Sequence, residues 1–299
     1  MGNLATSSRL KMVETTVIPA ILYGVEAFPS LSKSEQELLE KMQGKLLKDL
    51  MELPQSTPYE ALLLELGMPT MEARVNYRKL MVYQNIRSSD DRRIIKKVLE
   101  EQQKMDREGT WVNGLKNILD KYKIKDTTDE DLKSTWKSKV KSRIAEVTEK
   151  EIRERCGQKS KARTALKGEY NLKGYLKETS ITQATQILRA RLHMTKLPCN
   201  YKQDTKDEGC PLCGAQSIRT EHYFHCDQTK ALRKAWNTSQ DDLISESTAD
   251  LIKAASFLEA VSLKIQPQWK DAAYGGKKPK TAAVCTPSLT PTHNYILNT

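Results

Sequence analysis

The chain has 299 residues, of which 38% are hydrophobic, 6% aromatic and 29% charged, so we expect small helical units joined by charged connections instead of one large core. Its formal net charge of +11 favours a polyanionic partner, nucleic acid before acidic membrane. No run approaches the roughly 20 apolar residues of a membrane helix and no secretory signal is visible, so we expect an intracellular protein, in the nucleus or the cytoplasm, with reduced cysteines.

The N-terminal third is predicted to be a series of helices. An apolar run over residues 17–22 surrounds Pro19. Ser34 and Glu37 match a capping box, in which each residue satisfies an amide of the other. A helix follows that Pro54 ends, and its apolar residues recur at three- and four-residue steps: Leu38, Leu39, Met42, Leu46, Leu50 and Leu53. We interpret this face as core, with a groove for a protein partner as the alternative.

Two more helices are predicted before residue 90. Thr57-Pro58-Tyr59-Glu60 is typical of a helix start, with proline at the first helical position. Residues 62–66 fill this short helix, and Gly67 ends it. A longer helix is predicted from about Met71 to Ile86.

Residues 90–177 are highly charged and poor in apolar side chains. Between Lys137 and Lys167 there are eleven lysines and arginines and only four glutamates. One interpretation is an exposed helix pair laced with salt bridges, and the other is a strip that follows a phosphate backbone. Tyr170 and Tyr175, just beyond the strip, could stack on bases. The candidate residues in this strip are Lys137, Lys139, Lys141 and Arg143.

The last part of the chain is predicted to contain two helices and a tail. Ser180 and Gln183 form another capping-box pattern, and the amphipathic helix that follows carries Arg189 and Arg191 on its polar face. A second helix is predicted over residues 243–263. From about residue 265 the chain has no periodicity and is predicted to be disordered.

Between these two helices lies a pattern of metal ligands. Cys210 and Cys213 are separated by two residues and can bind one metal from a tight turn, and His222 and Cys226 are one helical turn apart. Thr220 is predicted to cap the helix that carries the second pair. Four soft ligands suit tetrahedral zinc and leave no open position, so we predict one structural zinc ion. Two residues remain as alternatives or spare ligands: His225 in place of His222, and Cys199.

Two parts of the chain resemble one family. Residues 18–26, Ile-Pro-Ala-Ile-Leu-Tyr-Gly-Val-Glu, are similar to the element that follows the palm in non-LTR (LINE-type) retrotransposon reverse transcriptases. Residues 53–69 contain further motifs in that family's order. Residues 210–214 and 220–226 resemble the zinc-binding segment downstream of such polymerases, and Trp236 lies where that segment often has a tryptophan. The resemblance covers roughly residues 8–100 and 180–237.

The resemblance and the patterns together predict a mainly α fold in four parts. We expect a thumb-like helical bundle over residues 1–105 and a charged helical connector over residues 106–178. An amphipathic helix, a small CCHC zinc module and a following helix are expected over residues 179–264, and the disordered tail over residues 265–299.

The departures from the family bear on function. Its polymerase site is a Tyr/Phe-x-Asp-Asp turn, whereas Asp90-Asp91 and Asp241-Asp242 follow no aromatic residue or strand-like run, and the chain starts where the palm would have ended. The Pro-Asp pair of the nuclease found in some relatives is absent from the sequence. We therefore expect a catalytically inactive C-terminal fragment of such a reverse transcriptase.

What we expect to remain is binding of nucleic acid, foremost single-stranded RNA, with no small-molecule substrate and no membrane partner. Phosphates would contact the basic candidates, and an exposed aromatic residue, Tyr223 or Phe224, would stack on bases. Alternatively, Phe224 is buried against Leu232 and Trp236. The rival interpretation is a zinc-stabilised helical module that binds protein.

Overall fold

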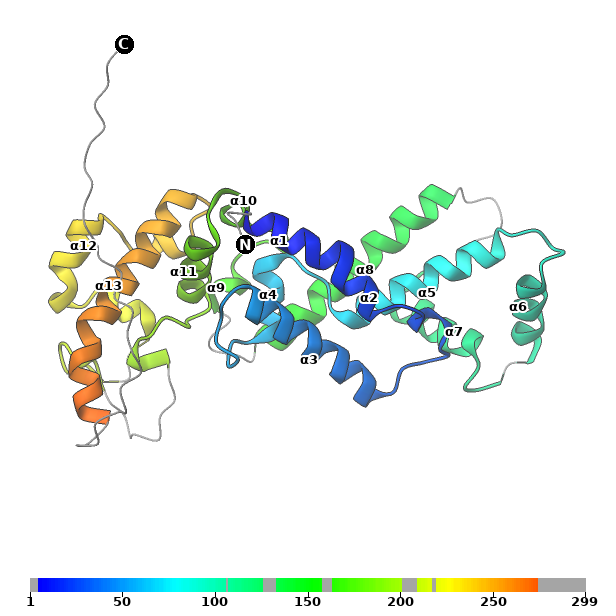
Figure 1. The fold of residues 1–299 in the computed structure, drawn as a ribbon, viewed down its shortest axis with the longest axis horizontal. Helices are drawn as coiled ribbons and strands as arrows, with labels where there is room; N and C mark the ends of the chain where they lie inside the picture. Colours follow the sequence, from blue (N-terminus) through cyan, green and yellow to red (C-terminus); the bar gives the residue numbers. More distant parts are fainter. Residues whose placement is uncertain are drawn as a thin grey trace, which may run out of the picture.

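A computed structural model of the protein describes residues 5–105, 107–125, 133–157, 163–200, 209–216 and 219–273. Across these ranges the regular structure is helical and no strand is present, which confirms the predicted mainly α fold. The molecule is elongated, with α6 and α7 towards one end and α12 and α13 at the other (Figure 1). Within the same ranges, no helix is both long enough and apolar enough to cross a bilayer.

The described residues form the following helices, in chain order. A π-helical turn over Val13–Val17 joins the first two, and the α-helices are α1 (Thr6–Met12), α2 (Ile18–Ile21), α3 (Lys33–Leu50), α4 (Tyr59–Leu66), α5 (Met71–Arg87), α6 (Ile94–Met105), α7 (Trp111–Lys121), α8 (Lys133–Gly157), α9 (Arg163–Leu166), α10 (Tyr175–Glu178), α11 (Ile181–Arg191), α12 (Lys230–Trp236) and α13 (Thr248–Ala273).

Helix α3 begins earlier than its capping pattern predicted. Ser32, not Ser34, is the N-cap: the Glu35 amide donates to Ser32 Oγ over 3.3 Å, and the Ser32 amide donates to Glu35 Oε2 over 2.7 Å. The sequence offers the same motif in two registers, Ser32 with Glu35 and Ser34 with Glu37. The earlier register lengthens the helix at its N-terminus, so it is the one used.

The buried face of α3 also differs from the predicted apolar face. Of the predicted residues, Leu53 is buried and three are partly buried against the core, namely Leu39, Leu46 and Leu50, whereas Leu38 and Met42 are exposed. The fully buried residues within the helix are Gln43, Gly44 and Leu47. The Tyr59 ring covers the helix at Gly44 and lies so close that a Cβ there would be 3.1 Å from Cδ2. The Tyr59 hydroxyl lies 2.7 Å from Gln43 Oε1. Hydrophobic periodicity cannot predict a buried stripe that contains glutamine and glycine.

Helix α4 is enclosed by the rest of the molecule. Every residue from position 61 to 66 is buried, including Glu65. Pro58 is its N-cap instead of its first helical residue, and Gly67 ends it as predicted, with a φ of +62°. A Cβ at position 67 would lie 2.3 Å from the backbone carbon of Asn171. Glycine is therefore needed there both for the left-handed conformation and for the close approach of the next segment.

The charged middle of the chain contains a hydrophobic core of its own. Trp136, Val140 and Ile144 of α8 are buried at four-residue spacing, in a cluster with Leu80 of α5 and Leu115 of α7. Charged residues occupy most positions between them. One apolar residue per turn is therefore enough to pack this helix against α5 and α7. The interpretation of an exposed helix pair is therefore wrong for the N-terminal half of α8.

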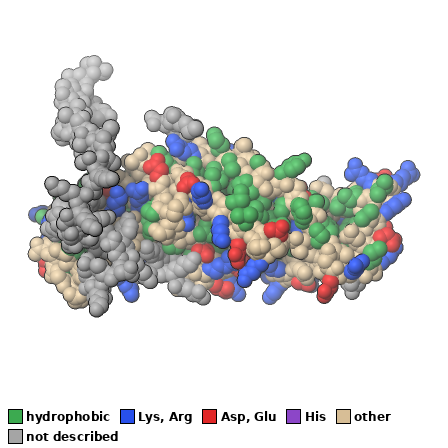
Figure 2. Space-filling model, turned by 60° about the horizontal axis from the view of Figure 1, so that its bottom comes forward, with side chains coloured by type: hydrophobic (Ala, Val, Ile, Leu, Met, Phe, Trp, Pro, Cys, Tyr) green, Lys and Arg blue, Asp and Glu red, His purple; other side chains and the backbone are tan. Residues whose placement is uncertain are grey.

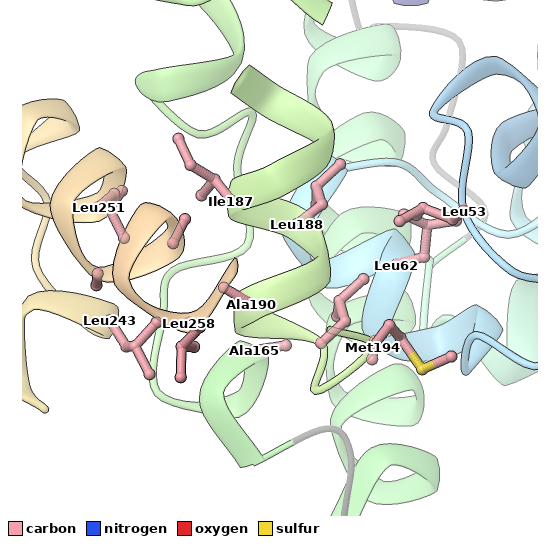
Figure 3. Packing of buried hydrophobic residues seen from close by; sticks show 14 of the residues in the cluster. Leu53, Leu62, Ala165, Ile187, Leu188, Ala190, Met194, Leu243, Leu251 and Leu258 are labelled. Atoms are coloured by element: carbon pink, nitrogen blue, oxygen red, sulfur yellow. The ribbon is translucent and has the colours of Figure 1, made fainter. Parts of the chain in front are cut away.

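Helix α11 lies at the centre of the main core. It begins with the predicted capping box of Ser180 and Gln183. Figure 3 shows α11 between two neighbours, with Ile187 on the side of α13 and Leu188 on the side of α4. Helix α13 begins at Thr248 instead of residue 243, because residues 241–243 form a separate 3-10 turn.

The C-terminal end of α13 also differs from the prediction. The helix runs to Ala273, past the predicted start of the tail at residue 265. The remainder of the predicted tail, residues 274–299, lies outside the described residues. The main core contains Leu47, Ile152 and Leu188, from three of the four predicted segments, and the segment boundaries themselves stay a prediction.

A buried ion pair joins α4 to α11. Arg191 Nε and Nη2 donate to the two oxygens of the Glu65 carboxylate over 2.8 and 2.9 Å. The Tyr175 hydroxyl donates to the same carboxylate over 2.9 Å, and Arg191 Nη1 donates to the Leu243 carbonyl. Burial alone would lower the pKa of Arg191, but the Glu65 charge and hydrogen bonds outweigh it and raise that pKa, so the guanidinium stays charged.

Replacing Arg191 by leucine would leave the Glu65 carboxylate buried without its cation. We expect the free energy of unfolding to fall by about 3–5 kcal/mol, the usual cost of breaking one half of a buried pair. Urea denaturation followed by circular dichroism measures it. Arg189→Leu is the control, because Arg189 is half-buried and donates to one backbone carbonyl, that of Glu52. A loss at Arg191 no larger than at Arg189 would contradict the role given to the pair.

Candidate metal centre and basic groove

The four predicted metal ligands lie together. The ligand atoms of Cys210, Cys213, His222 and Cys226 are all within 4.8 Å of one another, and Cys213 Sγ is 3.3 Å from His222 Nε2. All the cysteines that the structure describes are free thiols. These four side chains could therefore hold one metal ion, with three sulfurs and one imidazole nitrogen as its ligands.

The first two ligands are positioned by a tight backbone turn. The Gly214 amide donates to the Cys210 carbonyl over 2.7 Å, and the Cys210 amide donates to the Ala215 carbonyl over 2.7 Å. Gly214 has a φ of +73°, in the left-handed region that favours glycine. Gly209 allows the two ends of the turn to approach, since a Cβ there would be 2.3 Å from the Ala215 oxygen. The turn thus directs both sulfurs to the same side.

The second pair of ligands was predicted to lie on one α-helix, but His222 lies on a 3-10 turn and Cys226 follows it, just before a second 3-10 turn. Residues 220–224 form the first turn, and the Cys226 amide donates to the His222 carbonyl over 2.8 Å. Thr220 does not cap it. Its hydroxyl donates to Asn200 Oδ1 over 2.9 Å instead, so the turn is attached to the segment that follows α11. The one-turn spacing still brings the two ligands to one side.

The environment shifts the pKa values of the ligands in different directions. Burial raises the pKa of the Cys210 thiol to about 11, whereas a hydrogen bond with the Ala215 backbone lowers the pKa of Cys213. Burial, and next the charge of His225, lowers the pKa of His222 and favours the neutral imidazole that a metal binds. Cys210 and Cys226 are buried and Cys213 is exposed, so the cluster lies at the edge of the core.

Among the described residues, the other cysteines and histidines lie outside the cluster. Cys199 is half-buried, with its sulfur 3.9 Å from Thr220 Oγ1. His225 turns away, with its Nε2 2.8 Å from Gln240 Oε1. His193 is buried, 3.1 Å from Thr164 Oγ1. The predicted choice of His222 over His225 thus agrees with the geometry.

The aromatic residues beside the metal ligands are buried, which corrects the prediction that Tyr223 is exposed. Tyr223 is 0% exposed and Phe224 4% exposed, so neither ring can stack on a base. The 3-10 turn directs both rings inwards, where the Phe224 ring lies 4.9 Å from the ring of Phe257 on α13. Trp236, one of the neighbours predicted for Phe224, remains partly exposed.

The predicted basic residues fall into two groups. Arg143 donates to the Tyr122 carbonyl and pairs with Glu146, Arg189 donates to a backbone carbonyl, and Arg191 is buried against Glu65. The prediction that Arg191 contacts nucleic acid is wrong, because its guanidinium is enclosed. The other three candidates are exposed on α8: Lys137, Lys139 and Lys141.

Lys137 and Lys141 lie at a groove of about 610 Å³ that the sequence does not reveal. Apolar residues of α2, α5 and α8 line it, and so do two arginines of α5, two tyrosines and one carboxylate. These residues include Ile18, Leu22, Ala73, Ile144, Arg74, Arg78, Tyr77, Tyr170 and Glu14. These residues come from distant parts of the chain. In the sequence, only the basic strip between Lys137 and Lys167 indicates this site.

Comparisons with protein-family models, with curated proteins and with solved structures give no match.

Replacing Cys210 by serine should abolish metal binding. We expect elemental analysis of the dialysed protein to find close to one metal ion per chain, and close to none in Cys210→Ser, because a hydroxyl is a poor replacement for a thiolate ligand. Cys199→Ser is the matched control, a nearby cysteine outside the cluster. Full metal content in Cys210→Ser would contradict the assignment of the ligands.

Proposed function

We propose that this protein binds single-stranded RNA, that a structural zinc ion holds its C-terminal module, and that it acts by binding without catalysis of its own. The proposal retains the resemblance to the thumb and zinc-binding regions of non-LTR reverse transcriptases, which rests on the sequence motifs given above. It includes no small-molecule substrate and no membrane partner.

The chemistry of the ligands supports zinc as the metal. Three thiolates and one imidazole match its preference for soft ligands in tetrahedral geometry. With four protein ligands, such an ion has no open position for water and serves folding. It would join the turn at residues 210–214 to the turn at residues 220–226, and through Phe224 it would hold both against α13.

The two acidic pairs have contacts typical of turns. Asp91 pairs with Lys96, and Asp242 accepts hydrogen bonds from the Ser239 amide and the Thr238 hydroxyl. These contacts support a local structural role for both pairs, in keeping with a function in binding.

The observation that carries the RNA proposal is the groove with unbalanced lysines at its edge. Residues 133–145 of α8 contain no aspartate or glutamate, and within the described residues neither Lys137 nor Lys141 makes an ion pair. The C-terminal half of α8 is different, because Arg153 and Arg155 pair with glutamates one turn away. The salt bridges expected along the basic strip thus lie in the C-terminal half of α8, and the lysines of its N-terminal half are available to a phosphate.

The charge around this groove favours an anion. Arg74 and Arg78 lie along it with the two lysines, and its one carboxylate, Glu14, is already paired with Arg74 over 2.9 Å. Phosphate groups that contact such cations release condensed counterions, which makes the affinity fall with rising salt. The nearby tyrosines and apolar residues suit the exposed bases of a single strand more than the enclosed bases of a duplex.

Removing the two groove lysines should weaken RNA binding in a salt-dependent way. For Lys137→Ala/Lys141→Ala we expect the slope of log affinity against log salt, measured by fluorescence anisotropy with a labelled single strand, to become shallower by about 0.7, the value for the loss of one phosphate contact that the two lysines share. The matched control is Lys41→Ala/Lys45→Ala on α3, an exposed pair with the same spacing that does not line the groove. Equal slopes for both variants would contradict the proposed site.

A second candidate function is self-association through α6. Ile94 is 80% exposed and Met105 64%, with Ile95 and Val98 about half exposed, so the apolar side of this helix is largely uncovered. Figure 2 shows Lys and Arg side chains gathered beside hydrophobic ones at this end of the molecule. A groove of about 310 Å³ beside α6 could accept an apolar side chain of a second copy.

The charges of α6 fit a second copy in antiparallel orientation. Lys97 comes just before Glu100 and Glu101 along the helix. In a twofold antiparallel pair centred near Val98, each Lys97 would lie near Glu100 of the other copy, while Glu101 pairs with Lys104 of its own helix over 2.8 Å. The uncovered apolar side and this charge pattern together favour a homodimer over an unrelated partner.

Replacing Val98 by lysine should disrupt this association. We expect the mass of the wild type, measured by light scattering, to rise above 34.0 kDa with concentration, and the mass of Val98→Lys to stay near that value. Leu38→Lys is the control, an exposed leucine on α3 away from α6. A wild-type mass that does not change with concentration would remove this candidate.

A further inference from the structure

We propose that the groove between α2, α5 and α8 receives one unstacked base of the bound strand, with the neighbouring phosphate held at Lys137 and Lys141. This inference rests on the proposed function and adds the part of the RNA that the groove recognises. The ligand class is a nucleotide unit within a strand.

The shape and lining of the groove suit a nucleobase. Its volume of about 610 Å³ is in the range of small-molecule sites, which are apolar with few polar groups. Ile18, Leu22 and Ile144 contribute apolar surface, and the rings of Tyr77 and Tyr170 line the same groove. A base has two apolar faces and a polar edge, so it can lie against such a surface and keep its edge for hydrogen bonds.

Two buried polar atoms in the groove lack partners. Arg74 Nε and Tyr170 OH are both buried, and neither makes a hydrogen bond within the described structure. Buried donors without partners are costly and uncommon. The edge of every base carries nitrogen or oxygen acceptors, which could accept from both atoms. Burial is the main reason why the pKa of Tyr170 is raised, and it keeps the hydroxyl protonated as a donor.

Arg74 and Tyr170, which carry these two unpaired donors, are held in place by other contacts. Arg74 Nη2 donates to Glu14 Oε1 over 2.9 Å, which fixes its guanidinium. Tyr170 belongs to a segment fixed at both ends: Arg153 donates to the Leu166 and Gly168 carbonyls over 2.9 Å, and Asn171 lies against Gly67. A site positioned in advance loses less entropy when it binds a ligand.

The cations at the groove account for the phosphate. Arg78 already has partners within the protein: its Nη1 donates to the Leu22 carbonyl over 2.6 Å and lies 3.5 Å from Glu26 Oε2. Lys137 and Lys141 are one turn apart on α8 and exposed, so both ammonium groups can reach the mouth of the groove. A single phosphate next to the inserted base would contact both lysines. The one carboxylate that lines the groove, Glu14, would not repel it, because it is already paired with Arg74.

The test compares an intact strand with a strand that has no bases. The full zinc-loaded chain is titrated, at fixed salt, into a labelled oligouridylate and into the abasic strand of the same length. We expect the wild type to bind the intact strand about tenfold more tightly, the size of one base–aromatic stack. Tyr170→Ala should lose this preference without changing the salt slope, whereas Tyr23→Ala, which removes an exposed tyrosine outside the groove, should keep it.

A second measurement covers the case in which Tyr170→Ala does not fold. The fluorescence of a 2-aminopurine base placed in the strand changes when that base is unstacked. We expect this fluorescence to change when the strand binds the wild type, and to change less when it binds Tyr170→Phe. This variant keeps the ring and loses the hydroxyl. Free uridine monophosphate distinguishes the two sources of the ligand: binding as tight as that of the strand would overturn a site for strand-borne bases.

The outcomes separate this inference from the proposed function. Equal affinity of the wild type for intact and abasic strands, with an unchanged 2-aminopurine signal, would overturn base insertion while RNA binding stands. No affinity for either strand would overturn both.

Discussion

The contact on which the rest of the structure depends is the buried pair of Glu65 and Arg191. It places a carboxylate in the middle of α4, where the other buried residues are apolar, and connects it to α11, to Tyr175 and to the Leu243 carbonyl. A pair so deeply buried contributes little net stability, but each charge strongly disfavours any packing that separates it from the other. The pair therefore fixes how α11 lies against α4.

The two candidate sites lie on either side of this contact. On one side, α11 packs against α13, and α13 holds the aromatic ring beside the metal ligands. On the other side, α4 ends at Gly67, whose close contact with Asn171 places Tyr170 at the groove. The candidate metal ligands lie at the end of the molecule that holds α12 and α13, and the helices that line the groove, α2, α5 and α8, lie towards its middle (Figure 1). In the proposed function the first has a structural role and the second contacts the ligand.

The features that could be predicted from sequence are those encoded locally. The metal ligands are close in sequence, and the caps at Ser180 and Gly67 depend on neighbouring residues, so spacing alone identifies them. The buried polar residues could not be predicted, because Glu65 and Arg191 are far apart in sequence and each looks like a surface residue. The groove needs four distant segments to meet. The direction of Tyr223 depends on a 3-10 turn where an α-helix was expected.

Helix α8 has a consequence for how the molecule responds to a ligand. Its N-terminal half belongs to the core of α5 and α7 through Trp136, and its C-terminal half belongs to the main core through Ile152 and Cys156. Because one continuous helix is shared, neither core can unfold completely without losing part of the surface that the other buries. The two cores are thus thermodynamically coupled. By mass action, a ligand that binds only the folded form at Lys137 and Lys141 would also stabilise the distant end that carries the candidate metal ligands.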